Sequence, residues 1–187
     1  DVTFDFSAEN RMTVHANVAE PWRVTLVDTG LNTQTGARIK RVQKYIEDEP
    51  FMLTYGDGVS DVDLNALLKQ HRASGKTVTL TGVQPGGRFG VLDLDETGTT
   101  ISGFREKARE DGGWINGGFM VMDSGVFEYL SEDGRCILER EPLESLARAG
   151  KLGVYKHPGF WQCMDTQRDR GRLEALWPDG KAEWKRW

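Results

Sequence analysis

The sequence predicts a mixed α/β fold with a mostly parallel central sheet. Residues 51–55 form an almost wholly apolar run, which is typical of a strand buried on both faces of a parallel sheet. Strand-like and helix-like segments alternate along most of the chain, as in layered α/β proteins. Two hairpin-like patterns, at residues 2–18 and 91–106, interrupt this order and make the predicted sheet mixed.

Length and composition predict one soluble globular domain covering residues 1–187, without internal repeats. The chain has 187 residues, of which 38% are hydrophobic and 28% charged. A chain of this length buries roughly 70% of its unfolded surface. No apolar run approaches membrane-spanning length, so we expect no membrane partner. The net charge of −5, without a basic stripe, argues against a nucleic-acid partner.

The two cysteines indicate a reducing compartment. Cys136 and Cys163 are far apart and form neither a disulfide framework nor a CxxC pair, so we expect a cytoplasmic protein. The chain has no initiator methionine and begins at once in a strand-like pattern. We therefore expect that its true N-terminus is missing from these 187 residues.

The first half of the chain carries alternating strand and helix signals. The hairpin at 2–18 is followed by a short predicted strand at 24–27 and a helix at 35–46, whose apolar residues recur at helical spacing. The strand at 51–55 comes next. We expect either Asp61 or Asp63 to cap the helix after it.

That helix carries an apolar stripe which includes His71 and ends at Gly75. A histidine on such a stripe is predicted to pack in the core rather than to act in catalysis. The second half of the chain adds these elements in order: strands at 78–83, 91–94, 100–106 and 115–122, helices at 124–130 and from Pro142 to Gly150, a strand at 152–155, and a last helix containing Leu173 and Leu176.

Asp57 is the first candidate site residue. It follows the apolar strand and stands between Gly56 and Gly58, whose small size leaves room for a bulky ligand. Ligands of open α/β sheets bind beyond the carboxyl ends of the strands. A carboxylate placed there could hold a divalent cation that binds phosphates. Capping of a turn is the structural alternative.

Three further clusters also follow strand signals. Lys107 could bind a phosphate and Glu106 sugar hydroxyls, although an exposed ion pair is the better explanation of these two residues taken alone. Glycines after Asn116 indicate that a ligand approaches the backbone closely, with a functionless bulge as the alternative. Asp165 could be a second metal ligand, but Thr166 with Asp169 also forms a capping-box pattern.

Six ordered stretches, taken together, resemble the sugar-1-phosphate nucleotidylyltransferases. They are residues 20–30, 54–59, 88–90, 106–107, 115–119 and 157–166. The resemblance implies a Rossmann-like nucleotidyltransferase fold, truncated at its N-terminus, and nucleotidyl transfer from CTP to glucose 1-phosphate, giving CDP-glucose and pyrophosphate. It further implies Mg²⁺ as cofactor and a role in lipopolysaccharide O-antigen biosynthesis. The Trp-rich tail and the N-terminal hairpin are candidate interface elements of a homo-oligomer, with packing within one subunit as the alternative.

The resemblance also assigns roles to individual residues. Asp57 and Asp165 would hold Mg²⁺ and Lys107 would bind the sugar phosphate. Arg38 would face the phosphates near the nucleotide. The residues implied to line the substrate pocket are Thr54, Gly56, Gly90, Glu106, Asn116 and Gly118.

Two departures from the family pattern stand out. Ala108 replaces the proline that follows the Glu-Lys pair, and the Gly-rich loop that wraps the triphosphate is absent from the 187 residues. We therefore expect these residues alone to bind a sugar phosphate without catalysing the transfer. Two other functions stay open: a metal-dependent glycosyltransferase, which the acids Asp61 and Asp63 would suit, and a non-catalytic sugar-phosphate-binding domain.

Overall fold

The computed structural model describes most of the chain. The described residues are 2–7, 11–15, 22–46, 48–85, 91–94, 101–105, 113–178 and 180–185. Among them, no helix is both long enough and apolar enough to cross a lipid bilayer.

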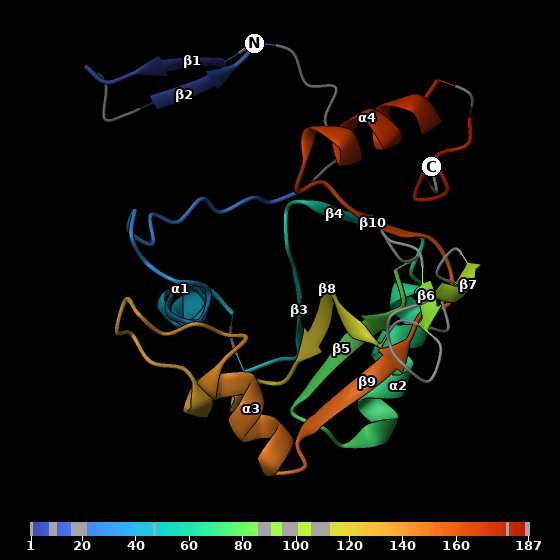
Figure 1. The fold of residues 1–187 in the computed structure, drawn as a ribbon. Coiled ribbons are helices and arrows are strands. Elements are labelled where there is room, and N and C mark those ends of the chain that lie inside the picture. The colour runs from blue at the N-terminus through green and yellow to red at the C-terminus, as the bar shows by residue number, and fades with distance from the viewer. Residues whose placement is uncertain are drawn as a thin grey trace.

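A four-stranded sheet forms the centre of the structure (Figure 1). Its strands are β3 (Phe51–Thr54), β8 (Ile115–Met122), β5 (Val78–Val83) and β9 (Leu152–Lys156), in that spatial order. β8 pairs antiparallel with both β3 and β5, and β9 pairs parallel with β5. Three strands therefore run in one direction and β8 runs in the other, which confirms the mixed sheet.

The prediction that residues 51–55 form a strand buried on both faces is wrong. β3 lies at an end of the described sheet, where β8 is its one neighbour. Its burial alternates along the strand, and Met52 is 47% exposed. The strand is mainly apolar because one face packs on the core, and the sequence alone does not reveal that the other face is open.

Helices cover both faces of the sheet (Figure 1). α1 (Thr35–Val42), the 3-10 helix η3 (Ser124–Tyr129) and α3 (Glu141–Arg148) supply residues to the main core cluster on one face, together with Val78 and Met120. α2 (Leu64–Ser74) packs on β5, β8 and β9. Side chains alternate between the two faces of a strand, so Thr79, next to Val78, turns to α2.

His71 is a core histidine, as predicted. Its side chain is 2% exposed; Nδ1 lies 2.9 Å from Thr79 Oγ1, and Nε2 lies 3.2 Å from Asp123 Oδ1. Both ring nitrogens thus have partners on the sheet side of α2, which removes the cost of burying the imidazole. The role of His71 is to join α2 to β5 and to the end of β8.

Smaller elements surround the sheet. β1 (Val2–Asp5) and β2 (Arg11–Val14) form the predicted N-terminal hairpin, which lies apart from the sheet at the top of Figure 1. β6 (Val91–Leu94) pairs with β7 (Ile101–Arg105), and β4 (Gly58–Ser60) with β10 (Trp161–Cys163). The 3-10 helix η1 (Gln43–Tyr45) extends α1, and α4 (Gln167–Leu176) follows β10.

One local prediction is wrong, and two predictions of helix caps are confirmed. Residues 24–27 form no strand, since no described strand lies beside them to supply ladder hydrogen bonds, and Leu26 is 91% exposed. Asp63 caps α2 by accepting a hydrogen bond from the Ala66 amide, whereas Asp61 binds the loop that follows β9. The predicted capping box of Thr166 and Asp169 at the start of α4 is confirmed.

Candidate functional site

The candidate site lies where β3 ends and β8 begins. Because β8 runs opposite to β3, its first residues meet the carboxyl end of β3: Thr54 is paired with Phe119, and the Tyr55 amide donates to the Gly118 carbonyl. A pocket of about 200 Å³ opens at this edge. Its lining consists of Thr54, Tyr55, Asp57, Gly58, Asn116, Gly117, Gly118, Phe119, Trp161, Cys163 and Asp165.

The β4–β10 pair brings the two candidate metal ligands to this pocket. Cys163 lies opposite Gly58, and just beyond it the Met164 amide donates to the Asp57 carbonyl over 2.8 Å. Asp57 and Asp165, far apart in sequence, therefore line the same cavity. The capping box next to Asp165 uses Thr166 and Asp169, so the α4 cap does not compete for the Asp165 carboxylate.

A turn at the start of β8 shapes the opposite wall. Gly118 adopts a φ of +79°, a conformation that strongly favours glycine. Asn116 Oδ1 accepts a hydrogen bond from the Gly118 amide over 2.9 Å, which fixes the asparagine side chain at the pocket. The register of β8 against β5 shifts in this region, so the predicted bulge is real and it lines the cavity.

Tyr55 connects the pocket to α1. Its hydroxyl donates to Glu139 Oε1, and Glu139 Oε2 accepts from the Thr35 hydroxyl at the start of α1 over 2.8 Å. Burial, followed by the neighbouring Glu139 carboxylate, raises the pKa of the Tyr55 phenol. The phenol therefore stays protonated near neutral pH and acts as a hydrogen-bond donor.

Cys163 adds a thiol to the same wall. Burial, and then the adjacent Asp165 carboxylate, raises the pKa of this thiol. A thiol in this state is a poor nucleophile, so Cys163 is a neutral neighbour of Asp165 at this site.

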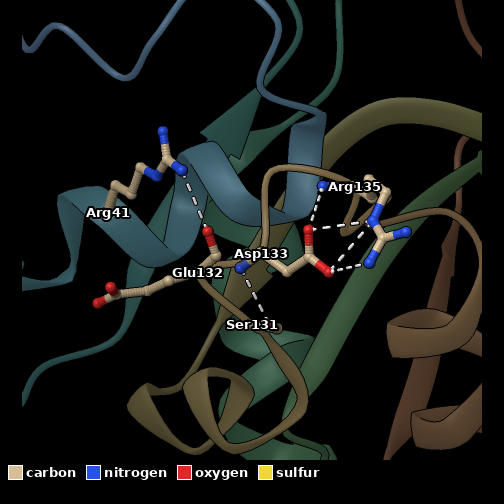
Figure 2. A network of polar contacts seen from close by, with 5 residues as sticks. All are labelled: Arg41, Ser131, Glu132, Asp133 and Arg135. Carbon is tan, nitrogen blue, oxygen red and sulfur yellow. Dashed lines mark hydrogen bonds and ion pairs between the residues drawn. The ribbon is translucent and has the colours of Figure 1, made fainter.

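Arg38 is not among the residues that line the pocket. From α1 it donates to Thr29 Oγ1 over 2.6 Å and to the Leu31 carbonyl over 3.1 Å, and so holds the preceding turn. Figure 2 shows the neighbouring anchor, where Arg41 donates to the Glu132 carbonyl. These contacts fasten α1 to the segments on either side of it, and the structure does not bring Arg38 together with Asp57 and Asp165.

The two acids of the pocket suit a hard cation that takes its other ligands from phosphate and water. Within the described ranges, no three His, Cys, Asp or Glu side chains are grouped closely enough to hold a metal ion. Two carboxylates with an open cavity between the walls nevertheless match Mg²⁺, which is usually bound by one or two carboxylates together with phosphate oxygens and water. The donor set fits a metal that arrives with a phosphate substrate.

The remaining predicted site residues are Gly56, Gly90, Glu106 and Lys107. Gly90, Glu106 and Lys107 lie outside the described residues. Gly56 lies in the turn between β3 and β4, directly before Asp57. Sequence reasoning missed Tyr55 and Trp161 as wall residues, although both stand inside the stretches that carried the family resemblance.

Comparison with known proteins identifies the family. A family model described as nucleotidyl transferase matches residues 8–178. The glucose-1-phosphate cytidylyltransferases of Salmonella typhi and Salmonella typhimurium are each 51% identical over 188 residues, which cover all of this chain and 72% of each relative. A structure from Bacillus anthracis assigned as a glucose-1-phosphate thymidylyltransferase matches with a TM-score of 0.60 at 17% identity, over 83% of this chain and 63% of that one, and supports the fold alone. The chain therefore belongs to the nucleotidyl transferase family and, within it, to the glucose-1-phosphate cytidylyltransferases.

Proposed function

We propose that this chain takes part in Mg²⁺-dependent transfer of a cytidylyl group from CTP to glucose 1-phosphate, giving CDP-glucose and pyrophosphate. The observation that carries the proposal is the convergence of Asp57, Asp165 and Asn116 on one pocket. The substrates named for the Salmonella relatives support the same assignment.

The residue types match the demands of this reaction. The phosphate of the sugar is already an anionic nucleophile, so no strong general base is needed. The difficulty is to hold two anions together and to stabilise charge on the α-phosphorus and the departing pyrophosphate. Mg²⁺ bound between Asp57 and Asp165 would supply that charge stabilisation.

The pocket walls would orient the sugar. Asn116, whose Oδ1 is held by the Gly118 amide, would turn its amide nitrogen to the hydroxyl groups. By the family resemblance, Glu106 and Gly90 would complete the sugar site and Lys107 would bind the sugar phosphate. By the same resemblance, Arg38 would act on the nucleotide side; in the structure its guanidinium donates to Thr29 Oγ1 and to the Leu31 carbonyl.

The reaction is tested by pyrophosphate release. We would assay the 187-residue chain alone, and also fused to the part of the Salmonella typhi relative that it does not match. The fused protein is expected to release pyrophosphate from CTP only with glucose 1-phosphate and Mg²⁺, while the chain alone binds glucose 1-phosphate by calorimetry. Release of a nucleoside diphosphate from a nucleotide sugar, with no pyrophosphate, would contradict the proposal.

We also propose a homo-oligomer in the cytoplasm. Apolar side chains of the N-terminal region are widely exposed, with Phe6 at 80% and Trp22 at 79%, and a second copy would cover them. Both cysteines are unpaired, in keeping with a reducing compartment. Light scattering is expected to give a molar mass that is a multiple of 21.0 kDa, and a strictly monomeric mass at micromolar concentration would overturn the oligomer.

A further inference from the structure

A buried polar pair lies beside the candidate site and takes no direct part in lining it. His157 Nε2 is 2.9 Å from Asp61 Oδ1, and the side chains are 7% and 19% exposed. His157 follows β9 and Asp61 follows β4, so the pair joins two segments that are far apart in sequence. Neither side chain is among the lining residues of the pocket.

The hydrogen bonds around the pair define its geometry. Asp61 Oδ1 also accepts from the Phe160 amide over 2.7 Å, and the Asp61 amide donates to the Phe160 carbonyl over 3.2 Å. His157 Nε2 lies 3.1 Å from that same carbonyl. A carbonyl and a carboxylate both accept, so Nε2 must carry a proton.

Gly159 completes the arrangement. A Cβ atom at this position would lie 2.5 Å from Asp61 Oδ1 and 2.7 Å from His157 Cε1. The loop between β9 and β10 can therefore close over the pair only with glycine at 159.

The pair stands at one end of the short β4–β10 ladder, and the candidate metal ligands stand at the other. Ser60 lies opposite Trp161 next to the pair, and three residues further along the Asp57 carbonyl accepts from the Met164 amide. We propose that Asp61 and His157 are positioning residues, whose contact sets the register of β10 on β4 and thereby the placement of Asp165 opposite Asp57. This inference rests on the proposed metal site.

The test compares variants at Asp61 and at its close neighbour Asp63 in the 187-residue chain. Asp61→Ala removes the acceptor, Asp61→Asn keeps an acceptor oxygen without the charge, and Asp63→Ala removes only the α2 cap. Paramagnetic resonance gives the dissociation constant for Mn²⁺. Loss of a residue that orients a metal ligand typically weakens metal binding by about 10- to 100-fold, and we expect this range for Asp61→Ala.

The matched variants separate positioning from general destabilisation. Asp63→Ala is expected to lower the melting temperature and leave Mn²⁺ affinity unchanged, while Asp61→Asn restores most of the affinity. If Asp61→Asn is as damaging as Asp61→Ala, the negative charge acts directly and positioning is overturned. His157→Phe keeps the ring volume without a donor, and it takes the place of Asp61→Ala if that variant does not fold.

A second readout does not depend on the metal. Cys163 lies on β10 opposite Gly58 of β4, so a shifted strand changes the exposure of the thiol and with it the rate of its alkylation by iodoacetamide. Cys136 serves as the internal control in the same sample. If Asp57→Asn binds Mn²⁺ as tightly as the parent chain does, the proposed metal site is wrong. The alkylation rates of Cys163 then still test whether Asp61 and His157 set the position of β10. Unchanged rates and unchanged Mn²⁺ binding in both Asp61→Ala and His157→Phe would refute it.

Discussion

Replacing Asp57 or Asp165 by asparagine is expected to slow pyrophosphate release by about 100-fold or more, because each change removes one of the two carboxylates of the pocket. Asparagine keeps the size and one oxygen of the side chain but not its negative charge. A divalent cation would then be held by one carboxylate, and the charge that develops during phosphoryl transfer would be poorly compensated. The effect should therefore appear mainly in the turnover number.

The measurement uses the fused protein for turnover and the 187-residue chain for Mn²⁺ binding. Asp133→Asn is the matched control, because Asp133 is an exposed acid whose carboxylate binds Arg135 (Figure 2) and which does not line the pocket. It should leave both quantities unchanged. Near-normal turnover of Asp57→Asn or Asp165→Asn at saturating Mg²⁺ would remove that residue from the metal site.

Local sequence patterns predicted most of the helices and strands. The strand at β8, the hairpin at residues 2–14, the helix that begins at Thr35 and the capping box at Thr166 all follow from spacing and from capping chemistry within a few residues. These features depend on neighbours in the sequence, so the sequence displays them directly.

Contacts between segments that are far apart in the sequence could not be predicted from local patterns. The Tyr55–Glu139 bond spans 84 residues, and no local pattern indicates that Glu139 faces the pocket wall. Asp61 looked like a helix cap because it lies near the start of α2, yet its partner is His157. The sequence of residues 24–27 was strand-like, but a strand also needs a neighbour, and the described structure provides none there.

The approach of Asp57 and Asp165 to one pocket was predicted, but local patterns alone did not predict it. Taken alone, Asp57 was as well explained by a turn, and the stretch at Asp165 was better explained by a helix cap. The order of six stretches along the chain favoured the metal-site interpretation, and the β4–β10 ladder supplies the physical reason why the two acids line one cavity. The family resemblance therefore stood in for tertiary information that spacing could not give.

Gly118→Ala is expected to destabilise the chain by about 2–5 kcal/mol and to weaken glucose 1-phosphate binding strongly. A φ of +79° costs a non-glycine residue about 1–2 kcal/mol. The added Cβ would also lie 2.8 Å from Tyr55 Cδ2, and such overpacking costs typically 1–3 kcal/mol. A ring that moves away from this Cβ strains its bond to Glu139, which would distort the wall that faces Asp57.

Gly75→Ala provides the control for the backbone alone. Gly75 ends α2 with a φ of +61°, and a Cβ there would meet no atom within 4 Å. Its replacement should cost about 1 kcal/mol, since only the left-handed conformation is penalised, and should leave ligand binding intact. Urea unfolding of both variants gives the two free energies, and calorimetry gives the affinity for glucose 1-phosphate. If Gly118→Ala costs no more than Gly75→Ala and binds the sugar phosphate normally, the contact between Gly118 and Tyr55 does not shape the pocket.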